Sequence, residues 1–501
     1  MPTRTPTPAP RLRSATVLAA AALSLVLAAC GSQLEPGDVR GVSQTTSDGT
    51  AADPIEGQAD APITGDDGAP VAPSGDDGGV DTPADEPASG SDPGAPSDDA
   101  PDTDDAPDTG DNAADGGSDA GSCDGFANGP GITDSEITLA NVSDISGPVP
   151  GIFESARLGA RAYVSYFNST SDICGRKLKL LELDSRADAG ADQQAYATAC
   201  VQAFAAVGSM SAFDSGGAAT AAQCGLPDIR STTVNPERSK CATCFAAQSV
   251  SPGLVPTAWP SFFAKNFSAA TDNAALFYIN AGAAPVNAAA FREGYSKSGW
   301  KISVFEAIDV AEFNFAPYVQ KMKEKGVRLV YYIGPFQNTV KLQQAMRQQG
   351  FKPDVYVQDS TIYDQDYLDQ AGDLAKDVYV YTNIAPFDDT ANKEMQLYRA
   401  WLDQVSPGAS PNFYGVFAWS AARLFVEQAT KLGGELSRAD LVTALKKVTN
   451  WTANALHSGQ DVGGKTSGKC HAVLQYSGSA WKKVSPGDYL CGSLVSTGSG
   501  S

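Results

Sequence analysis

The feature that most constrains the fold of this chain is a repeated alternation of short apolar runs with longer amphipathic segments, which starts at Ile137. Apolar runs of this length predict buried strands, and the segments between them predict helices. Strands that alternate with helices form parallel sheets covered on both faces. The predicted strands are Ile137–Val142, Lys177–Leu183, Ala205–Met210, Pro227–Arg230, Ala274–Ile279, Lys301–Phe305, Val327–Ile333, Val355–Val357 and Val378–Tyr381.

The alternation restarts after Pro252, which predicts an α/β fold with two lobes, each a doubly wound and mainly parallel sheet. Three further helices are predicted after the second series, without strands between them. A hairpin of His471–Gln475 with Trp481–Val484 then ends the pattern. The three helices are predicted at Asn392–Val405, Tyr414–Leu432 and Ser437–Val448.

Residues 31–122 carry the whole net charge of the protein. They contain 23 acidic residues and one basic residue, Arg40, so their net charge of −22 equals that of the 501-residue chain. They also contain no aromatic residue, and such a segment cannot bury enough apolar surface to offset the entropy of ordering. We predict a disordered tether at 30–122. The near-neutral remainder argues against nucleic acid as a partner, because phosphates are bound by a basic face.

The first 30 residues have the pattern of an export signal. A basic start precedes an apolar run from Ala15 to Ala29 that is too short to span a bilayer. The run ends in Leu-Ala-Ala-Cys at 27–30, which resembles the lipobox of bacterial lipoproteins. That resemblance implies a signal peptide at 1–29, lipidation of Cys30, and a lipid-anchored location on the outer face of the cytoplasmic membrane. An ordinary secretory signal with an incidental cysteine is the alternative.

The eight other cysteines favour disulfides, because their number is even and the protein is predicted to be exported. Eight cysteines allow 105 connectivities. The Cys-x-x-Cys string at 241–244 is also compatible with redox chemistry or zinc, but no second Cys-x-x-Cys or histidine pair completes a metal site, so no metal is predicted. Proximity along the predicted fold favours the pairs Cys123–Cys174, Cys200–Cys224, Cys241–Cys244 and Cys470–Cys491.

Catalytic motifs are sparse. The chain has two histidines, His457 and His471, and neither a G-x-S-x-G nor an H-E-x-x-H string. Residues 459–466 match the phosphate-loop pattern, but no buried strand precedes them and no helix follows. We therefore predict a binding protein that is not an enzyme and has no cofactor. A hydrolase that uses only carboxylates stays open as an alternative.

Several strings, taken in order, resemble the type I periplasmic binding proteins of the branch that binds leucine, isoleucine and valine or amides. The resemblance extends over 132–490 and implies two lobes, three crossover segments, a ligand in the cleft, hinge closure and delivery to an ABC transporter permease. It places lobe 1 at 132–251 and 386–455 and lobe 2 at 252–385 and 463–491, within a domain at 123–501. The strings are Ile-Thr-Leu-Ala-Asn-Val at 137–142, Ser-Gly-Pro at 146–148, Gly-Ala-Arg at 159–161, Cys-Gly-Arg-Lys-Leu at 174–178, Leu-Glu-Leu-Asp at 181–184, Asn-Pro-Glu at 235–237, Val-Arg-Leu-Val-Tyr-Tyr at 327–332 and Tyr-Gly-Val-Phe-Ala-Trp at 414–419.

Ligands of open parallel sheets bind beyond the carboxyl ends of the strands. The resemblance implies that hydroxyls and backbone N–H groups at 211–213 and 232–234 hold a ligand carboxylate, and that Asp359 of lobe 2 holds an ammonium. Asp214 departs from this pattern, because it places a like charge beside the expected carboxylate and so favours an amine- or amide-bearing ligand. The predicted ligand-binding residues are Ser146, Ser211, Phe213, Asp214, Thr232, Thr233, Phe336, Asp359 and Ser360.

The predicted function is that of an extracytoplasmic solute-binding lipoprotein of an ABC importer. It would capture a small polar organic ligand, amino-acid-like or amide-like, by hinge closure. Since fold alone does not fix function, the alternative is a ligand-sensing lipoprotein that reports to a signalling partner.

Overall fold

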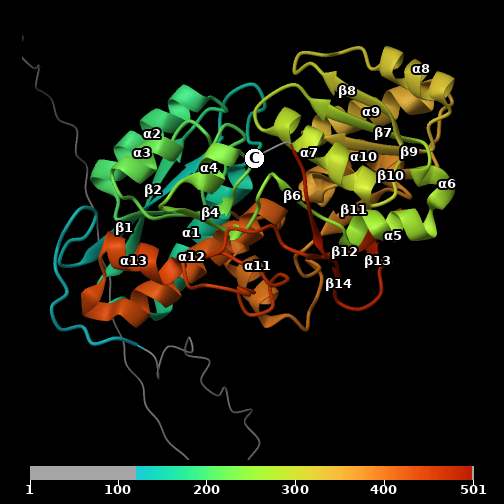
Figure 1. Ribbon diagram of the computed structural model, residues 1–501. Helices are drawn as coiled ribbons and strands as arrows, with labels where there is room; N and C mark the ends of the chain where they lie inside the picture. The colour runs from blue at the N-terminus through green and yellow to red at the C-terminus, as the bar shows by residue number, and fades with distance from the viewer. Residues whose placement is uncertain (1–119, 499–501) are drawn as a thin grey trace, which may run out of the picture. The chain divides into compact units, whose positions relative to one another are not determined.

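The computed structural model describes residues 120–498 (Figure 1). The predicted signal peptide, Cys30 and nearly all of the acidic segment lie outside the described residues. Within the described part, two β-sheets with helices packed around them form two lobes, which confirms the predicted α/β class.

Lobe 1 is built on a five-stranded parallel sheet in the order β2-β1-β3-β4-β5. Its register pairs Ile137 with Leu178 and Ile229 with Phe245. The strands are β1 Glu136–Ser143, β2 Lys177–Asp184, β3 Ala205–Val207, β4 Asp228–Thr232 and β5 Cys244–Gln248. The helices are α1 Glu154–Thr170, α2 Ala189–Gln202, α3 Ala218–Gln223, α4 Pro236–Lys240, α11 Lys393–Val405, α12 Phe413–Leu432 and α13 Arg438–Leu445.

Lobe 2 is built on a larger sheet in the order β13-β12-β11-β10-β9-β7-β8, with β14 paired to β12. The strands from β11 to β8 are parallel, whereas the C-terminal hairpin adds β12 antiparallel to β11. The strands are β7 Ala274–Ile279, β8 Ile302–Ile308, β9 Leu329–Ile333, β10 Val355–Gln358, β11 Tyr379–Thr382, β12 Cys470–Tyr476, β13 Trp481–Lys483 and β14 Leu490–Cys491. The helices are α5 Ala258–Asn266, α6 Ser268–Thr271, α7 Ala284–Lys297, α8 Ala316–Lys325, α9 Phe336–Gln348 and α10 Gln365–Ala371.

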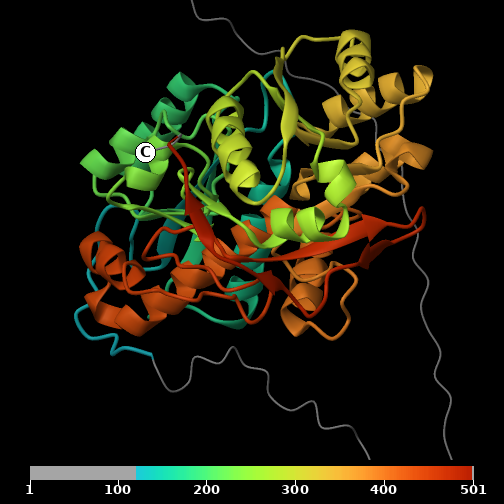
Figure 2. The ribbon, with the colours of Figure 1, turned by 45° about the vertical axis from the view of Figure 1, so that its right-hand side comes forward.

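The chain passes between the two sheets three times, after β5, after β11 and before β12. The crossing segments touch one another: Ile384 and His457 form a β-bridge, and the Ser467 hydroxyl accepts a hydrogen bond from Ser251 N at 2.9 Å. After the hairpin, β15 (Leu494–Ser496) pairs with β6 (Leu254–Pro256), so the C-terminal segment, red in Figure 2, returns beside the first crossing.

Helix α12 is the centre of lobe 1, where it packs on both α1 and β4. Asn412 begins this helix by accepting a hydrogen bond from Tyr414 N at 2.9 Å, and nearly every side chain from Gly415 to Ala422 is buried. A Cβ on Gly159 would lie 2.2 Å from the Gly415 carbonyl oxygen, so the two helices approach at a distance that only glycine permits. This packing fixes the end of β4, from which residues 232–235 extend.

The four disulfides present in the structure are those favoured by proximity in the predicted fold. They join Cys123 to Cys174, Cys200 to Cys224, Cys241 to Cys244, and Cys470 to Cys491. Within residues 120–498, no helix combines the length and apolarity needed to cross a membrane.

Candidate functional site

A cavity of about 240 Å³ lies between the two lobes, beyond the carboxyl ends of strands from both sheets. Lobe 1 contributes residues after β4 and β5 and the start of α12, whereas lobe 2 contributes residues after β7, β9, β10 and β11. This is the edge where open parallel sheets bind ligands. The polar side chains that line it are Thr232, Thr233, Gln248, Asn287, Asp359, Ser360, Thr361, Tyr381, Thr382, Asn383, Tyr414 and His471.

The two lobes are in contact at the rim of this cavity. Ala283 N donates to the Ala212 carbonyl oxygen at 3.0 Å, and the Asn287 amide donates to the Val234 carbonyl oxygen at 3.2 Å. Gly282 makes the approach possible: it has a φ of 54°, and a Cβ there would lie 2.7 Å from the Ala212 carbonyl oxygen. Two hydrogen bonds between opposite lobes therefore cross the rim of the cavity.

Asp359 lies directly after β10 and supplies the cavity's carboxylate. Its Oδ1 accepts a hydrogen bond from Thr361 N at 2.9 Å and another from the Thr361 hydroxyl, which caps a short 3₁₀ turn at Ser360–Ile362. Burial raises the pKa of Asp359 above its ordinary value, against the effect of these bonds. Within residues 120–498 no cation forms an ion pair with this carboxylate.

Asn383 and His471 are buried polar side chains of the cavity wall, and each has one buried atom without a hydrogen bond in the described chain. They are 2% and 7% exposed, and within the described chain neither Asn383 Oδ1 nor His471 Nδ1 has a hydrogen bond. Thr382 pairs with Ala472 across β11 and β12, so Asn383 and His471 are the next opposed residues. Burial lowers the pKa of His471 to about 4, so the imidazole is neutral at neutral pH.

The rest of the wall is mainly apolar and aromatic. Tyr381 is fixed by stacking on Trp259, with ring centroids 3.9 Å apart, and by a hydrogen bond to the Tyr331 hydroxyl at 2.9 Å. Phe153 lies edge-on to Tyr414 at 4.9 Å. Other apolar lining residues are Ile152, Met210, Val234, Val250, Ile279, Phe291, Ile333 and Phe413.

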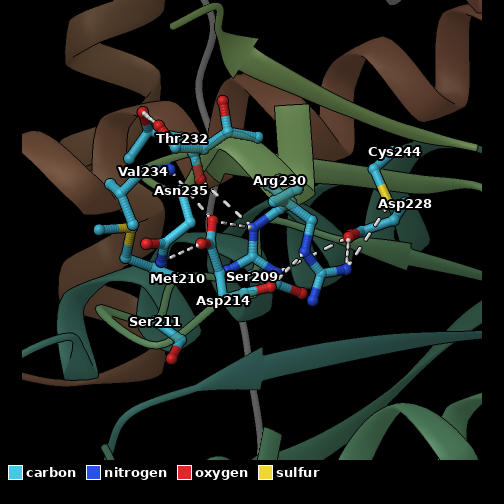
Figure 3. Close-up of polar contacts among 12 residues, drawn as sticks. Ser209, Met210, Ser211, Asp214, Asp228, Arg230, Thr232, Val234, Asn235 and Cys244 are labelled. Atoms are coloured by element: carbon cyan, nitrogen blue, oxygen red, sulfur yellow. Dashed lines mark hydrogen bonds and ion pairs between the residues drawn. The ribbon is translucent and has the colours of Figure 1, made fainter. Parts of the chain in front are cut away.

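Asp214 does not line the cavity, because its carboxylate turns into lobe 1 (Figure 3). It is fully buried, accepts hydrogen bonds from Val234 N at 3.1 Å and the Asn235 amide at 2.7 Å, and lies 3.7 Å from the Arg230 guanidinium. Arg230 in turn lies 3.7 Å from Asp228. Asp214, the residue that departs from the family's pattern, therefore forms an ion pair inside lobe 1.

Of the nine predicted ligand-binding residues, Thr232, Thr233, Asp359 and Ser360 line the cavity, and the other five do not. The Ser146 hydroxyl donates to Asp184 at 2.6 Å, and the buried Ser211 hydroxyl accepts a hydrogen bond from Phe213 N at 3.0 Å. Phe213 itself is partly exposed beside this turn. Asp214 pairs with Arg230, and Phe336 packs on the hydrophobic core.

Sequence reasoning did not select Asn383, His471, Tyr381 or Tyr414. Asn383 follows a predicted strand in the same way as Asp359 does, so the strand-end rule could have found it. His471 lies at the start of an antiparallel strand, and that end meets the carboxyl ends of the parallel strands. The antiparallel direction of β12 was therefore the signal that could have identified His471.

Neither alternative motif forms a reactive site. Lys465 of the phosphate-loop match donates to the Cys241 carbonyl oxygen and covers the Phe245 ring. The His457 ring lies 2.8 Å from the Ser420 hydroxyl, but both residues are enclosed in the core. No cluster that could hold a metal ion occurs within residues 120–498.

Two α/β lobes joined by three crossing segments around one interlobe cavity define a two-lobed binding protein. The chain belongs to the periplasmic binding protein family, whose model matches residues 136–473. It is 28% identical over 149 residues to "Leu/Ile/Val-binding protein homolog 1" of Brucella abortus (strain 2308). That match covers 30% of this chain and only 38% of the relative's length.

Solved structures with the same fold have different ligands in their titles. The branched-chain amino acid transporter substrate-binding protein LivJ of Streptococcus pneumoniae, in complex with isoleucine, has a TM-score of 0.57 at 16% identity, covering 70% of this chain and 100% of that one. A fatty acid ABC transporter substrate-binding protein of Thermomonospora curvata has a TM-score of 0.60 at 14% identity, covering 76% and 97%. The fold therefore leaves the ligand to be inferred from the cavity.

Proposed function

We propose that this protein is the extracytoplasmic solute-binding lipoprotein of an ABC importer. It captures a small organic molecule between its lobes and presents the closed form to a permease. The observation that carries the proposal is the interlobe cavity, which is lined by the Asp359 carboxylate. Within residues 120–498 this carboxylate has no ion-pair partner. A carboxylate that loses water on closure needs a partner, and a bound solute would supply one.

The crossing segments support capture by hinge closure. They lie side by side, joined at Ile384–His457 and Ser251–Ser467, so rotation about them would move one lobe against the other. A ligand that binds both walls favours the closed arrangement by its contacts there. Asn287 and Val234, which bond across the rim, would separate on opening.

Transport is favoured over catalysis by the chemistry of the wall. Among the residues that line the cavity there is one carboxylate and one neutral imidazole, with no serine–histidine pair and no second acid. The similar structures of LivJ and of the fatty acid protein are both titled as substrate-binding proteins of transporters. Lipid attachment at Cys30 would hold such a protein at the membrane that contains its permease.

The test is uptake in the source bacterium. Compounds that stabilise the purified protein in a thermal-shift screen are supplied in radiolabelled form to wild-type, deletion and complemented cells. We expect deletion to abolish uptake of the stabilising compound and the wild-type gene to restore it. Unchanged uptake, with an altered transcriptional response to the same compound, would instead favour the sensing role.

A further inference from the structure

We propose that the ligand is an organic ammonium ion with an apolar body and no carboxylate group. This inference rests on the proposed solute-binding function and narrows its ligand class. It excludes α-amino acids, which have a carboxylate beside the ammonium. The two walls of the cavity differ in how far the protein itself satisfies their hydrogen-bonding groups.

On the lobe 1 side, internal acceptors occupy three of the backbone N–H groups at 211–213 and 232–234, where a ligand carboxylate was expected. Ala212 N donates to Asp144 Oδ2 at 2.9 Å, and Val234 N donates to Asp214 Oδ2 at 3.1 Å. Phe213 N donates to the Ser211 hydroxyl at 3.0 Å. Two of these N–H groups are thus already bound by the carboxylates of Asp144 and Asp214, both completely buried within lobe 1.

The hydroxyls of the same wall are also engaged. The Thr233 hydroxyl donates to the Val250 carbonyl oxygen at 3.1 Å, and the Thr232 hydroxyl donates to the Thr233 carbonyl oxygen at 3.4 Å. No lysine or arginine is among the described residues that line the cavity. An anionic group would therefore lose its hydration without gaining a positive partner, which disfavours its binding.

The lobe 2 wall has the opposite character. Asp359 Oδ2 makes no hydrogen bond within the described chain, and neither do Asn383 Oδ1 and His471 Nδ1. The free oxygen of the Asp359 carboxylate is a hydrogen-bond acceptor, and an ammonium group offers up to three donors. Positive charge also pairs with the single carboxylate of the cavity lining, which has no ion-pair partner within the described chain.

Between these walls the lining suits an apolar body. Phe153, Phe291, Tyr381, Phe413 and Tyr414 bring five aromatic rings to the cavity. Aromatic faces attract organic cations as well as apolar groups. An amine with a branched aliphatic or aromatic substituent matches this distribution, with its charge towards Asp359 and its body towards lobe 1.

Calorimetric titration of the full-length protein with matched probes tests this. The amines 3-methylbutylamine and 2-phenylethylamine are leucine and phenylalanine without the carboxylate, and 4-methylpentanoate and 3-phenylpropionate replace the ammonium with a carboxylate. We expect at least one amine to bind at least tenfold more tightly than its amino acid. The two carboxylates should show no binding.

Variants locate the binding. Asp359→Asn should weaken amine binding at least 30-fold, whereas Asp354→Asn, at an exposed ion pair with Arg328 outside the cavity, should leave it unchanged. Tighter binding of leucine, phenylalanine or either carboxylate would overturn the ligand class while leaving solute binding intact. Absence of amine binding would also overturn the proposed ligand class. The uptake experiment would still test the transport function separately. If a variant fails to fold, the comparison of amines, amino acids and carboxylates on the wild-type protein still tests the ligand class.

Discussion

At the scale of single residues, the most consequential side chains are the charges buried beneath the lobe 1 wall. Arg230 and Arg238 have no exposed surface, and Arg238 bonds to Asp192 and Asp228 at 3.0 Å each. With Asp214 they connect the loop after β3 to the loop after β4. Figure 3 shows Asp214 beside Arg230 and Asn235. Removing one member of such a network leaves an uncompensated charge in the interior.

Asp214→Ala should therefore lower the free energy of unfolding by about 3–5 kcal/mol, because Arg230, Val234 N and Asn235 all lose a partner. Asp272→Ala is the matched control, since it breaks an exposed ion pair with Lys301 and should cost less than about 1 kcal/mol. Urea unfolding measures both. Equal losses would show that the buried network contributes no more than a surface pair.

His457 should make stability depend on pH. Burial lowers its pKa to about 4 from 6.5, so the unfolded chain binds a proton between these values and the folded protein does not. The free energy of unfolding should thus fall as pH drops from 6.5 towards 4, by up to about 3 kcal/mol at 1.36 kcal/mol per pKa unit. Unfolding of wild type and His457→Gln at pH 7, 6 and 5 checks this. A slope as steep in the variant would contradict it.

The site residues that the sequence could predict are those that immediately follow a parallel strand, such as Thr232 and Asp359. Asp214 was beyond reach, because the direction of its side chain depends on Arg230, which comes from a different strand. The local sequence of a loop is the same whether its carboxylate faces a ligand or binds an internal arginine. Only the packed structure distinguishes them.

At the scale of elements, all nine predicted strands exist within three residues of their predicted ends. Their apolar runs are bounded by turn residues, so burial and register follow from local pattern. Strand β5 (Cys244–Gln248) and helix α5 (Ala258–Asn266) were not predicted. Strand β5 has only five residues, and its burial depends on its pairing with β4. Helix α5 lies before the first predicted strand of lobe 2, outside the alternating pattern.

The disulfides should differ in their contribution to stability. Replacing Cys470 and Cys491 by serine opens a loop of 21 residues and should cost about 3 kcal/mol on the chain-entropy model. The same change at Cys241 and Cys244, three residues apart, should cost about half as much. Urea unfolding of the two double variants gives the order, and a reversed order would show that loop closure is not the main effect.

At the scale of the whole molecule, an importer component requires both a closing cavity and a position at the membrane. The cavity lies within the described residues, where three crossing segments join the lobes. The position at the membrane belongs to Cys30 and the acidic segment of residues 31–122, which lie outside them and were inferred from sequence alone. Fold and cavity location were predictable, whereas the ligand class required the hydrogen-bond partners of each wall.

Cys30→Ala should release the protein from the membrane, because multiple acyl chains on one cysteine are the inferred anchor. Fractionation after a salt and carbonate wash should find wild type in the membrane pellet and the variant in the soluble fraction. Ser32→Ala, two residues further on, is the control and should stay in the pellet. A variant that remains in the pellet would exclude lipid anchoring at Cys30.

The most direct measurement of solute binding is the amount of small molecule that the protein retains when purified from its own bacterium. Mass spectrometry of denatured samples compares wild type with Ala284→Trp, which fills the cavity, and with Ala289→Trp, on the same helix outside it. We expect about one molecule of one compound per chain in wild type and Ala289→Trp, and none in Ala284→Trp. Equal retention in all three proteins would contradict binding between the lobes.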